Sequence, residues 1–172
     1  MNKVICFHNP DEENGWLSNW YHSEFFINGF LFSTLEQYMM FEKARLFGDQ
    51  VSMDKVLSST DPAHNKEVGR SVQNYNETVW NGIRQIIVYE GLLEKFTQNG
   101  DLGRKLIQTG DAILAECAVK DKIWGIGLSM DDPNRFDLNA WQGQNLLGFT
   151  LMMVRDTIRA NDINTLWLQS LK

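Results

Sequence analysis

Residues 33–44 read STLEQYMMFEKA, and this stretch decides the fold because it places a helix directly after a tight turn. Ser33 followed three residues later by Glu36 fits a capping box, so we expect a helix to begin here. Helical spacing puts Glu36 and Lys43 on nearly the same side, about 10 Å apart along the axis. On this stretch alone, we interpret them as a capping glutamate and a lysine that extends its amine to solvent.

The segment before this helix carries the clearest local signal in the chain. Apolar runs at 24–27 and 30–32 flank Asn28-Gly29, a pair that tolerates positive φ at both centres of a type I′ turn. The pattern predicts a β-hairpin that leads straight into the helix.

Caps and apolar spacing predict the remaining elements. We expect a strand at 3–8 and helices at 49–58, 61–72, 76–98, 101–108 and 146–160. Gly91 interrupts the apolar pattern of the long helix. Residues 111–118 fit a strand or a helical turn, residues 121–128 a strand or a loop, and residues 129–139 a loop. Residues 1–172 are predicted to form one domain, with 161–172 as a C-terminal tail whose Leu166, Trp167 and Leu168 dock on the body.

Composition bounds the class of ligand. The chain has 172 residues, a net charge of −6 and no run of Lys or Arg. A protein that grips long nucleic acid usually presents a basic face, because phosphate contacts supply most of the affinity. Six Trp and ten Phe mildly favour a ligand with an aromatic base. We therefore expect a small ligand, held in a local basic pocket if it carries phosphate.

Cysteine usage and hydropathy indicate the compartment. Cys6 and Cys117 have no paired spacing, so no disulfide framework is predicted. The first residues do not resemble a signal peptide, and no apolar run approaches the roughly 20 residues of a membrane span. We expect a cytoplasmic protein with no membrane partner.

Several familiar chemistries lack support. The three histidines, His8, His22 and His64, have no ligand spacing, so no metal site is predicted. Gly125-Ile126-Gly127 is a GxG motif without a following helix and third glycine, and no GxSxG motif occurs.

Carboxylates among aromatic and small residues remain. Cleavage of a glycosidic bond needs a carboxylate to stabilise positive charge or to activate water, and Glu36 and Asp121 fit that need. Each residue taken singly is better explained structurally, as a helix cap, a turn residue, a core anchor or a surface charge. Trp80 and Trp124 have the chemistry to sandwich a base, and the residues with the chemistry to hold phosphate are Lys43, Lys66 and Arg70.

The motifs together resemble one family. In order, they are LSNWY at 17–21, EQY at 36–38 with Lys43-Ala44, KxxGR at 66–70, Trp80, KFxQN at 95–99, DxxWGIG at 121–127, WxGxNLLG at 141–148 and residues 152–155. Because so many separate motifs occur in one order, residues 5–158 are identified as similar to the NADAR (YbiA-like) family of N-glycosidases.

The resemblance implies a compact, predominantly helical α+β domain, in keeping with the hairpin and helices above. It implies a cofactor-free hydrolase that cleaves the N-glycosidic bond between a ribose and a nitrogen base. The associated substrates are phosphoribosyl pyrimidine intermediates of riboflavin biosynthesis and ADP-ribosyl groups, including those on guanine in nucleic acid. The alternative is a non-catalytic module that binds ADP-ribose or NAD-derived nucleotides.

The resemblance also implies site residues. The family's catalytic positions fall on Glu36, Asp121 and Trp80, with the division of acid and base roles between the carboxylates left open. Leu35 departs from the small residue that often precedes the family's glutamate, which leaves the pocket wall there undetermined. The substrate-binding positions fall on Lys43, Lys66, Gly69, Arg70, Trp124, Gly125 and Gly127.

Overall fold

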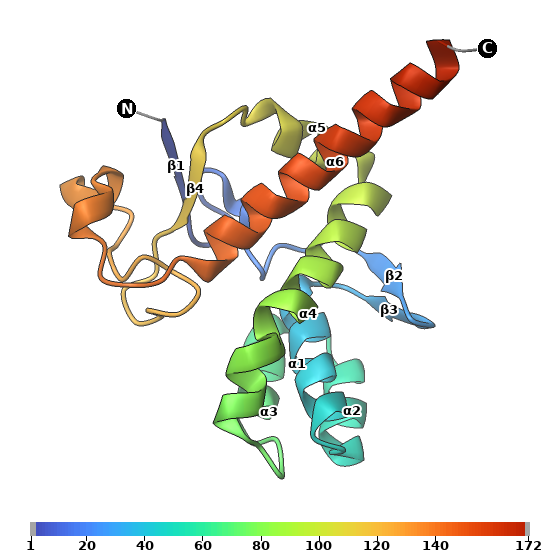
Figure 1. The fold of residues 1–172 in the computed structure, drawn as a ribbon. Coiled ribbons are helices and arrows are strands. Elements are labelled where there is room, and N and C mark those ends of the chain that lie inside the picture. Colours follow the sequence, from blue (N-terminus) through green and yellow to red (C-terminus); the bar gives the residue numbers. More distant parts are fainter. Residues whose placement is uncertain (1–2, 171–172) are drawn as a thin grey trace.

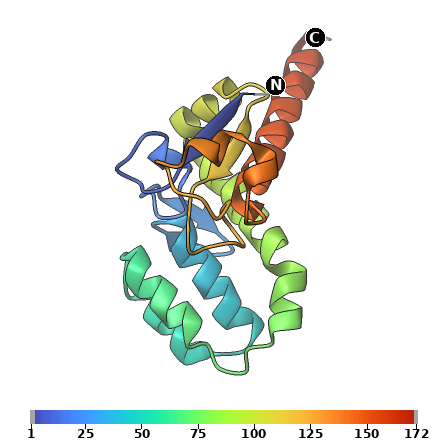
Figure 2. The same ribbon diagram turned by 90° about the vertical axis from the view of Figure 1, so that its left-hand side faces the viewer.

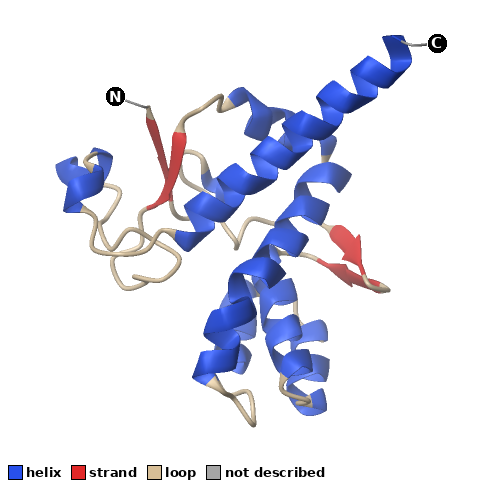
Figure 3. Ribbon diagram, in the orientation of Figure 1, coloured by secondary structure: helices blue, strands red, loops and turns tan. Residues whose placement is uncertain are grey.

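The computed structural model describes residues 3–170, with side-chain surroundings for residues 3–161. Helices dominate, and the strands form two separate pairs (Figure 3), which confirms a predominantly helical α+β fold. The strands are β1 (Val4–Phe7), β2 (Phe25–Ile27), β3 (Phe30–Phe32) and β4 (Ile113–Glu116). The α-helices are α1 (Leu35–Leu46), α2 (Gln50–Leu57), α3 (Pro62–Arg70), α4 (Glu77–Gln98), α5 (Gly100–Gln108) and α6 (Leu146–Ser170). Short 3-10 helices are η1 (Gly15–Leu17), η2 (Pro133–Phe136) and η3 (Leu138–Ala140).

The predicted hairpin is confirmed as the antiparallel pair β2–β3. Asn28 and Gly29 have φ values of 53° and 90°, as a type I′ turn requires. The end of α4 holds the hairpin in place through side-chain amides. Gln98 accepts from the Phe26 N–H at 2.8 Å and donates to the Phe26 carbonyl at 2.7 Å. Asn99 donates to the Glu24 carbonyl at 2.9 Å, so part of the KFxQN motif fixes the segment that leads into α1.

The start of α1 corrects one prediction. The helix is capped by Thr34, whose hydroxyl oxygen accepts from the Gln37 N–H at 3.1 Å. The Gln37 side chain in turn accepts from the Ser33 N–H at 2.8 Å. The predicted capping box of Ser33 and Glu36 is therefore wrong by one residue, and Glu36 is not the residue that closes it.

Helix α1 is the central element of the helical part. It packs against α2, α3 and α4 (Figure 1), and most of its residues are buried, including Glu36 and Glu42. Helix α4 continues unbroken through Gly91, because the glycine makes room for a neighbour. A Cβ at that position would lie 2.4 Å from the Tyr38 ring and 2.8 Å from the Leu35 side chain. Gly91 is thus a packing residue rather than a helix breaker.

Residues 111–118, which the sequence left undecided, contain the strand β4. It pairs in parallel with β1, so that Cys6 lies opposite Ala115 and Phe7 opposite Glu116. Asn145, at the start of α6, covers the other edge of β4. Its side chain accepts from the Glu116 N–H at 3.0 Å and donates to the Leu114 carbonyl at 2.8 Å. These bonds fix the carboxyl end of β4, from which a site residue projects.

The segment between β4 and α6 is a long loop that contains η2 and η3. Residues 121–128 are loop rather than strand, and Figure 2 shows this yellow-to-orange segment above the start of α1. Helix α6 continues to Ser170, past the predicted end at residue 160. The predicted docking of Leu166, Trp167 and Leu168 lies outside the described side chains. None of the helices within residues 3–170 combines the length and apolar character that a membrane crossing needs.

Candidate functional site

A cavity of about 590 Å³ opens between α1, α3, α4 and the loop after β4. Its wall carries more Lys and Arg than Asp and Glu, so we call it the basic cavity. Eight of the ten residues predicted for the site line it: Glu36, Lys43, Lys66, Gly69, Arg70, Trp80, Asp121 and Trp124. The fold therefore gathers residues from four separate segments around one space.

Glu36 lies in the first turn of α1 and is only 3% exposed. Its backbone N–H donates to the Asn19 carbonyl at 3.0 Å, and its carboxyl group faces the basic cavity. Burial, the largest effect, raises the pKa of Glu36 to about 7, while Lys66 and a side-chain hydrogen bond from Trp20 act in the opposite direction. A carboxyl group with such a pKa can serve as acid or base near neutral pH.

Lys43 lies on the same side of α1 as Glu36, two turns further on. Its Nζ donates to the Gly69 carbonyl at 2.6 Å and lies 4.3 Å from the centre of the Tyr75 ring. Burial lowers its pKa, and Glu36 opposes that shift. A Cβ on Gly69 would lie 1.8 Å from Sδ of Met40, another residue of the cavity wall, so the glycine allows α3 to approach α1.

Trp80 and Leu35 illustrate how core and site share residues. Trp80 is 6% exposed and belongs to the main hydrophobic core, yet it also lines the basic cavity, 5.7 Å from Nζ of Lys43. The structural and functional interpretations of Trp80 are thus compatible. Leu35 is fully buried against Gly91 and is absent from the cavity wall, so its departure from the family pattern falls in the core.

Asp121 begins the turn of the DxxWGIG motif. Its Oδ1 accepts from the Ile123 N–H at 3.1 Å and from the Trp124 N–H at 2.9 Å. Asp121 also lines the basic cavity. Asp121 therefore both shapes the loop and contributes charge to the site.

Gly125 and Gly127 do not line either of the two cavities described here. A Cβ on Gly125 would lie 2.8 Å from the Glu116 carbonyl oxygen, so this glycine lets the loop fold closely over the end of β4. Gly127 adopts a φ of 76°, a conformation that other residues rarely take. A direct contact of either glycine with ligand stays a prediction.

Among the residues of the basic cavity that sequence reasoning did not single out are Glu116 and Arg84, two charged residues with buried side-chain atoms. Glu116 is the last residue of β4, and the carboxyl end of a parallel strand is where site residues commonly lie. Its detection depended on recognising residues 113–116 as a strand. Arg84 lies one turn after Trp80 on α4, is 8% exposed, and has its guanidinium carbon 5.9 Å from the centre of the Trp124 ring. In the sequence, Arg84 follows Trp80 by four residues, a spacing that places both on the same face of a helix.

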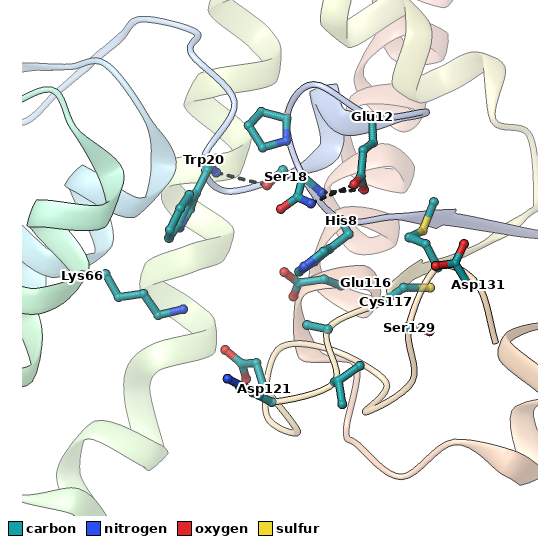
Figure 4. Close-up of a pocket in the computed structure, with 16 residues that line it drawn as sticks. His8, Glu12, Ser18, Trp20, Lys66, Glu116, Cys117, Asp121, Ser129 and Asp131 are labelled. Atoms are coloured by element: carbon teal, nitrogen blue, oxygen red, sulfur yellow. Dashed lines mark hydrogen bonds between the residues drawn. The ribbon is translucent and has the colours of Figure 1, made fainter.

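A second cavity of about 490 Å³, whose lining residues are drawn in Figure 4, shares part of its wall with the first. Its own wall includes Glu12 and Asp131, and we call it the acidic cavity. The residues that line both cavities are Trp20, Lys66, Glu116, Lys120 and Asp121. Burial raises the pKa of Glu116 to about 8, and the negative charges of Asp121 and Glu36 contribute to this increase. The carboxylates thus gather where the cavities meet.

Comparisons with known proteins agree on one family. A model of the NADAR domain matches residues 6–159. The mimivirus protein named N-glycosidase R617, from Acanthamoeba polyphaga mimivirus, is 38% identical over 162 residues, covering 90% of this chain and 95% of that protein. The riboflavin biosynthesis protein VVA0006 of Vibrio vulnificus is 33% identical over 159 residues, covering 92% of this chain but 40% of its own length. The NMR structure of the E. coli protein YbiA has a TM-score of 0.78 at 23% identity, with 95% of this chain and 89% of that chain covered, which shows a shared fold.

Proposed function

Because the chain belongs to the NADAR family, we propose that it is an N-glycosidase that hydrolyses the bond between a ribose and a nitrogen base. The observation that carries the proposal is the position of Glu36. Its buried carboxyl group shares a cavity with Asp121, with three tryptophans and with a set of cations. The name of the mimivirus relative, N-glycosidase R617, supports the same reaction.

The geometry accounts for the requirements of the reaction. As the C1′–N bond breaks, positive charge develops on the ribose ring, and a nearby carboxylate stabilises it. Glu36 and Asp121 supply this charge and accept the proton of the attacking water. Trp80 and Trp124 provide apolar faces for the ribose ring. Lys43, with the other cations of the wall, offers partners for phosphate oxygens.

The substrates that fit are nucleotide-like N-glycosides with a phosphorylated ribose. Phosphoribosyl pyrimidine intermediates of riboflavin biosynthesis are one class, and the name of the Vibrio vulnificus relative, riboflavin biosynthesis protein VVA0006, supports it. ADP-ribosyl groups, including those on guanine in nucleic acid, are the other. The net charge of −6 favours small molecules over a polymer, because a polyanion is repelled from an acidic surface.

The test is an assay panel that measures release of free base. It contains a phosphoribosyl pyrimidine, ADP-ribose derivatives and DNA with ADP-ribosylated guanine. We expect Glu36→Gln and Asp121→Asn each to lower the rate on the true substrate by about 100-fold or more. Asn at 121 retains the acceptor oxygen that holds the turn, so the loop is preserved.

The matched control is Glu67→Gln, which removes an exposed carboxylate beside Lys66 that lines neither cavity. This variant is expected to keep the full rate. Wild-type rates in folded Glu36→Gln and Asp121→Asn proteins would refute the catalytic assignment. Tight nucleotide binding by the wild-type protein without any base release over hours would instead indicate a non-catalytic binding module.

A further inference from the structure

The two adjoining cavities differ sharply in charge. The part of the wall that belongs only to the basic cavity has four cationic residues, Lys43, Arg70, Arg84 and Lys122, against two acidic ones, Glu36 and Glu77. Among the described residues, the part that belongs only to the acidic cavity contains no Lys or Arg. It presents Glu12 and Asp131 with the polar groups of Asn9 and Ser129 instead. A phosphate group is therefore attracted to one side and repelled from the other.

Two polar atoms, one at the junction of the cavities and one in the acidic cavity, lack partners. The Oε2 atom of Glu116 and the Nδ1 atom of His8 are buried without a hydrogen-bond partner. Figure 4 shows both side chains among those that line the acidic cavity, with the Lys66 ammonium group directed toward Glu116 and Asp121. Buried polar atoms without partners are costly, so they indicate a place where a ligand completes the hydrogen bonds.

We propose that the cavities are two halves of one substrate site, in which the basic cavity holds the phosphorylated ribose and the acidic cavity holds the nitrogen base, with Glu116 at their junction as proton donor to the departing base. The inference rests on the proposed N-glycosidase function. A base rich in N–H and amino groups, such as guanine or a diaminopyrimidine, can donate hydrogen bonds to carboxylates. The charged residues that line only the acidic cavity are the carboxylates Glu12 and Asp131.

The proton balance fits this placement. As the C1′–N bond breaks, its electron pair goes to the base nitrogen, which takes the Glu116 proton. Water adds its oxygen to C1′ and loses a proton to Glu36 or Asp121, and the products are the free base and a ribose with a hydroxyl at C1′. Burial, Asp121 and Glu36 together raise the pKa of Glu116 to about 8, so the donor form is present at neutral pH.

The placement is tested by binding rather than by activity. Ribose 5-phosphate and 2,4-diamino-6-hydroxypyrimidine are titrated separately into the full-length protein, and NMR shift changes are followed. We expect ribose 5-phosphate to move the indole N–H signals of Trp80 and Trp124, and the pyrimidine to move the amide signals of Val119 and Ser129. These residues belong to one cavity each, so the two ligands are read out independently.

Two substitutions should separate the ligands. Ser129→Trp fills the acidic cavity and is expected to weaken pyrimidine binding at least 10-fold, whereas Ser129→Thr is not. Arg70→Ala is expected to weaken ribose 5-phosphate binding about 10-fold and to leave the pyrimidine unaffected. Retained ribose 5-phosphate binding in Ser129→Trp shows that this variant is folded. The reverse pattern, or the absence of shifts in the wild-type protein, overturns the placement.

Glu116→Gln tests the proton donor. We expect base release to fall at least 100-fold while both binding signals persist, and base release at the wild-type rate would exclude Glu116 from that role. The outcomes also distinguish the inference from the function on which it rests. If base is released but the two ligands do not bind in separate cavities, the inference alone is refuted. The binding split without any base release refutes the proposed function and leaves the two-part site standing.

Discussion

The Gln37 side chain accepts a hydrogen bond from the Ser33 N–H at 2.8 Å, closing the start of α1. The same side chain donates to the carbonyls of Val56 at 3.1 Å and Ser59 at 2.9 Å, which ties α1 to the end of α2. Gln37 thus accepts the hydrogen bond from the Ser33 N–H that Glu36 was predicted to accept. Glu36 takes no part in this cap and lines the basic cavity, where it can act on a ligand.

Gln37→Ala is therefore expected to destabilise the fold. The substitution leaves the buried Ser33 N–H without its partner, a loss that typically costs about 1–3 kcal/mol, and it removes one of the hydrogen bonds that each of the Val56 and Ser59 carbonyls accepts. The free energy of unfolding, measured by urea denaturation, should fall by at least 2 kcal/mol, on the order expected for several lost bonds. Glu36→Gln is the comparison and should lose much less. A larger loss in Glu36→Gln would contradict the division of roles between these neighbours.

Stability should fall as pH rises through the range in which Glu36 titrates. Its pKa is about 7 in the folded protein and near 4.5 in the unfolded chain, so the folded state binds more protons between these values. The stability present below about pH 4.5 is then lost as pH rises through 7, by about 3 kcal/mol for a fully buried group.

Urea denaturation at several pH values checks this expectation. Glu116 adds to the same trend up to about pH 8, since its pKa is raised in the same direction. The wild-type protein should show the steeper slope between pH 5 and 7, and Glu36→Gln the flatter one. Equal slopes in the two proteins would show that Glu36 is not held in its neutral form by burial.

Lys95 should give the opposite pH dependence at higher pH. It is fully buried, and its Nζ donates to the carbonyls of Trp16 at 3.3 Å and Ser18 at 3.2 Å. Burial lowers its pKa to about 7, below the ordinary value of 10.5, so the unfolded chain binds more protons above pH 7. This group makes the fold more stable as pH rises from 7 toward 9.

Lys95→Met retains much of the packing and removes the titrating group. Between pH 7 and pH 9, the unfolding free energy of the wild type should increase relative to that of Lys95→Met. Because Lys95 also anchors the segment that leads to Trp20, the variant should weaken ligand binding. A difference that stays constant with pH would contradict the assigned titration.

Two glycines of α4 provide a matched pair for packing. A Cβ on Gly91 would lie 2.4 Å from the Tyr38 ring, whereas a Cβ on Gly82 meets nothing within 4 Å. Gly91→Ala should destabilise the protein by about 1–3 kcal/mol through overpacking. Gly82→Ala should stabilise it by about 0.5–1 kcal/mol, because alanine favours the helix. Thermal unfolding of both variants checks the pair, and a similar shift in both would show that Tyr38 yields easily.

Local signals were sufficient where a few neighbouring residues determine the backbone. Asn28-Gly29 determines its hairpin, and Asp61 with Pro62 determines the start of α3, because caps and turns are satisfied within four residues. The one-residue error at the start of α1 arose because Ser33 and Thr34 are both good caps. The hydrogen bonds of Gln37 to residues 56 and 59, distant in sequence, favour Thr34.

The sequence by itself determined the hairpin, most of the helices and, through its ordered motifs, the family. Tertiary structure decided the rest: that β4 pairs with β1, that Glu116 joins Glu36 and Asp121, and that the charges divide between two cavities. The physical reason is that caps and turns depend on neighbouring residues. Burial and electrostatic environment depend on residues far apart in the sequence, such as Glu36 and Glu116, which are 80 positions apart. Residues 33–44 specified a helix, and only the packed molecule showed which side chain of its first turn faces the cavity.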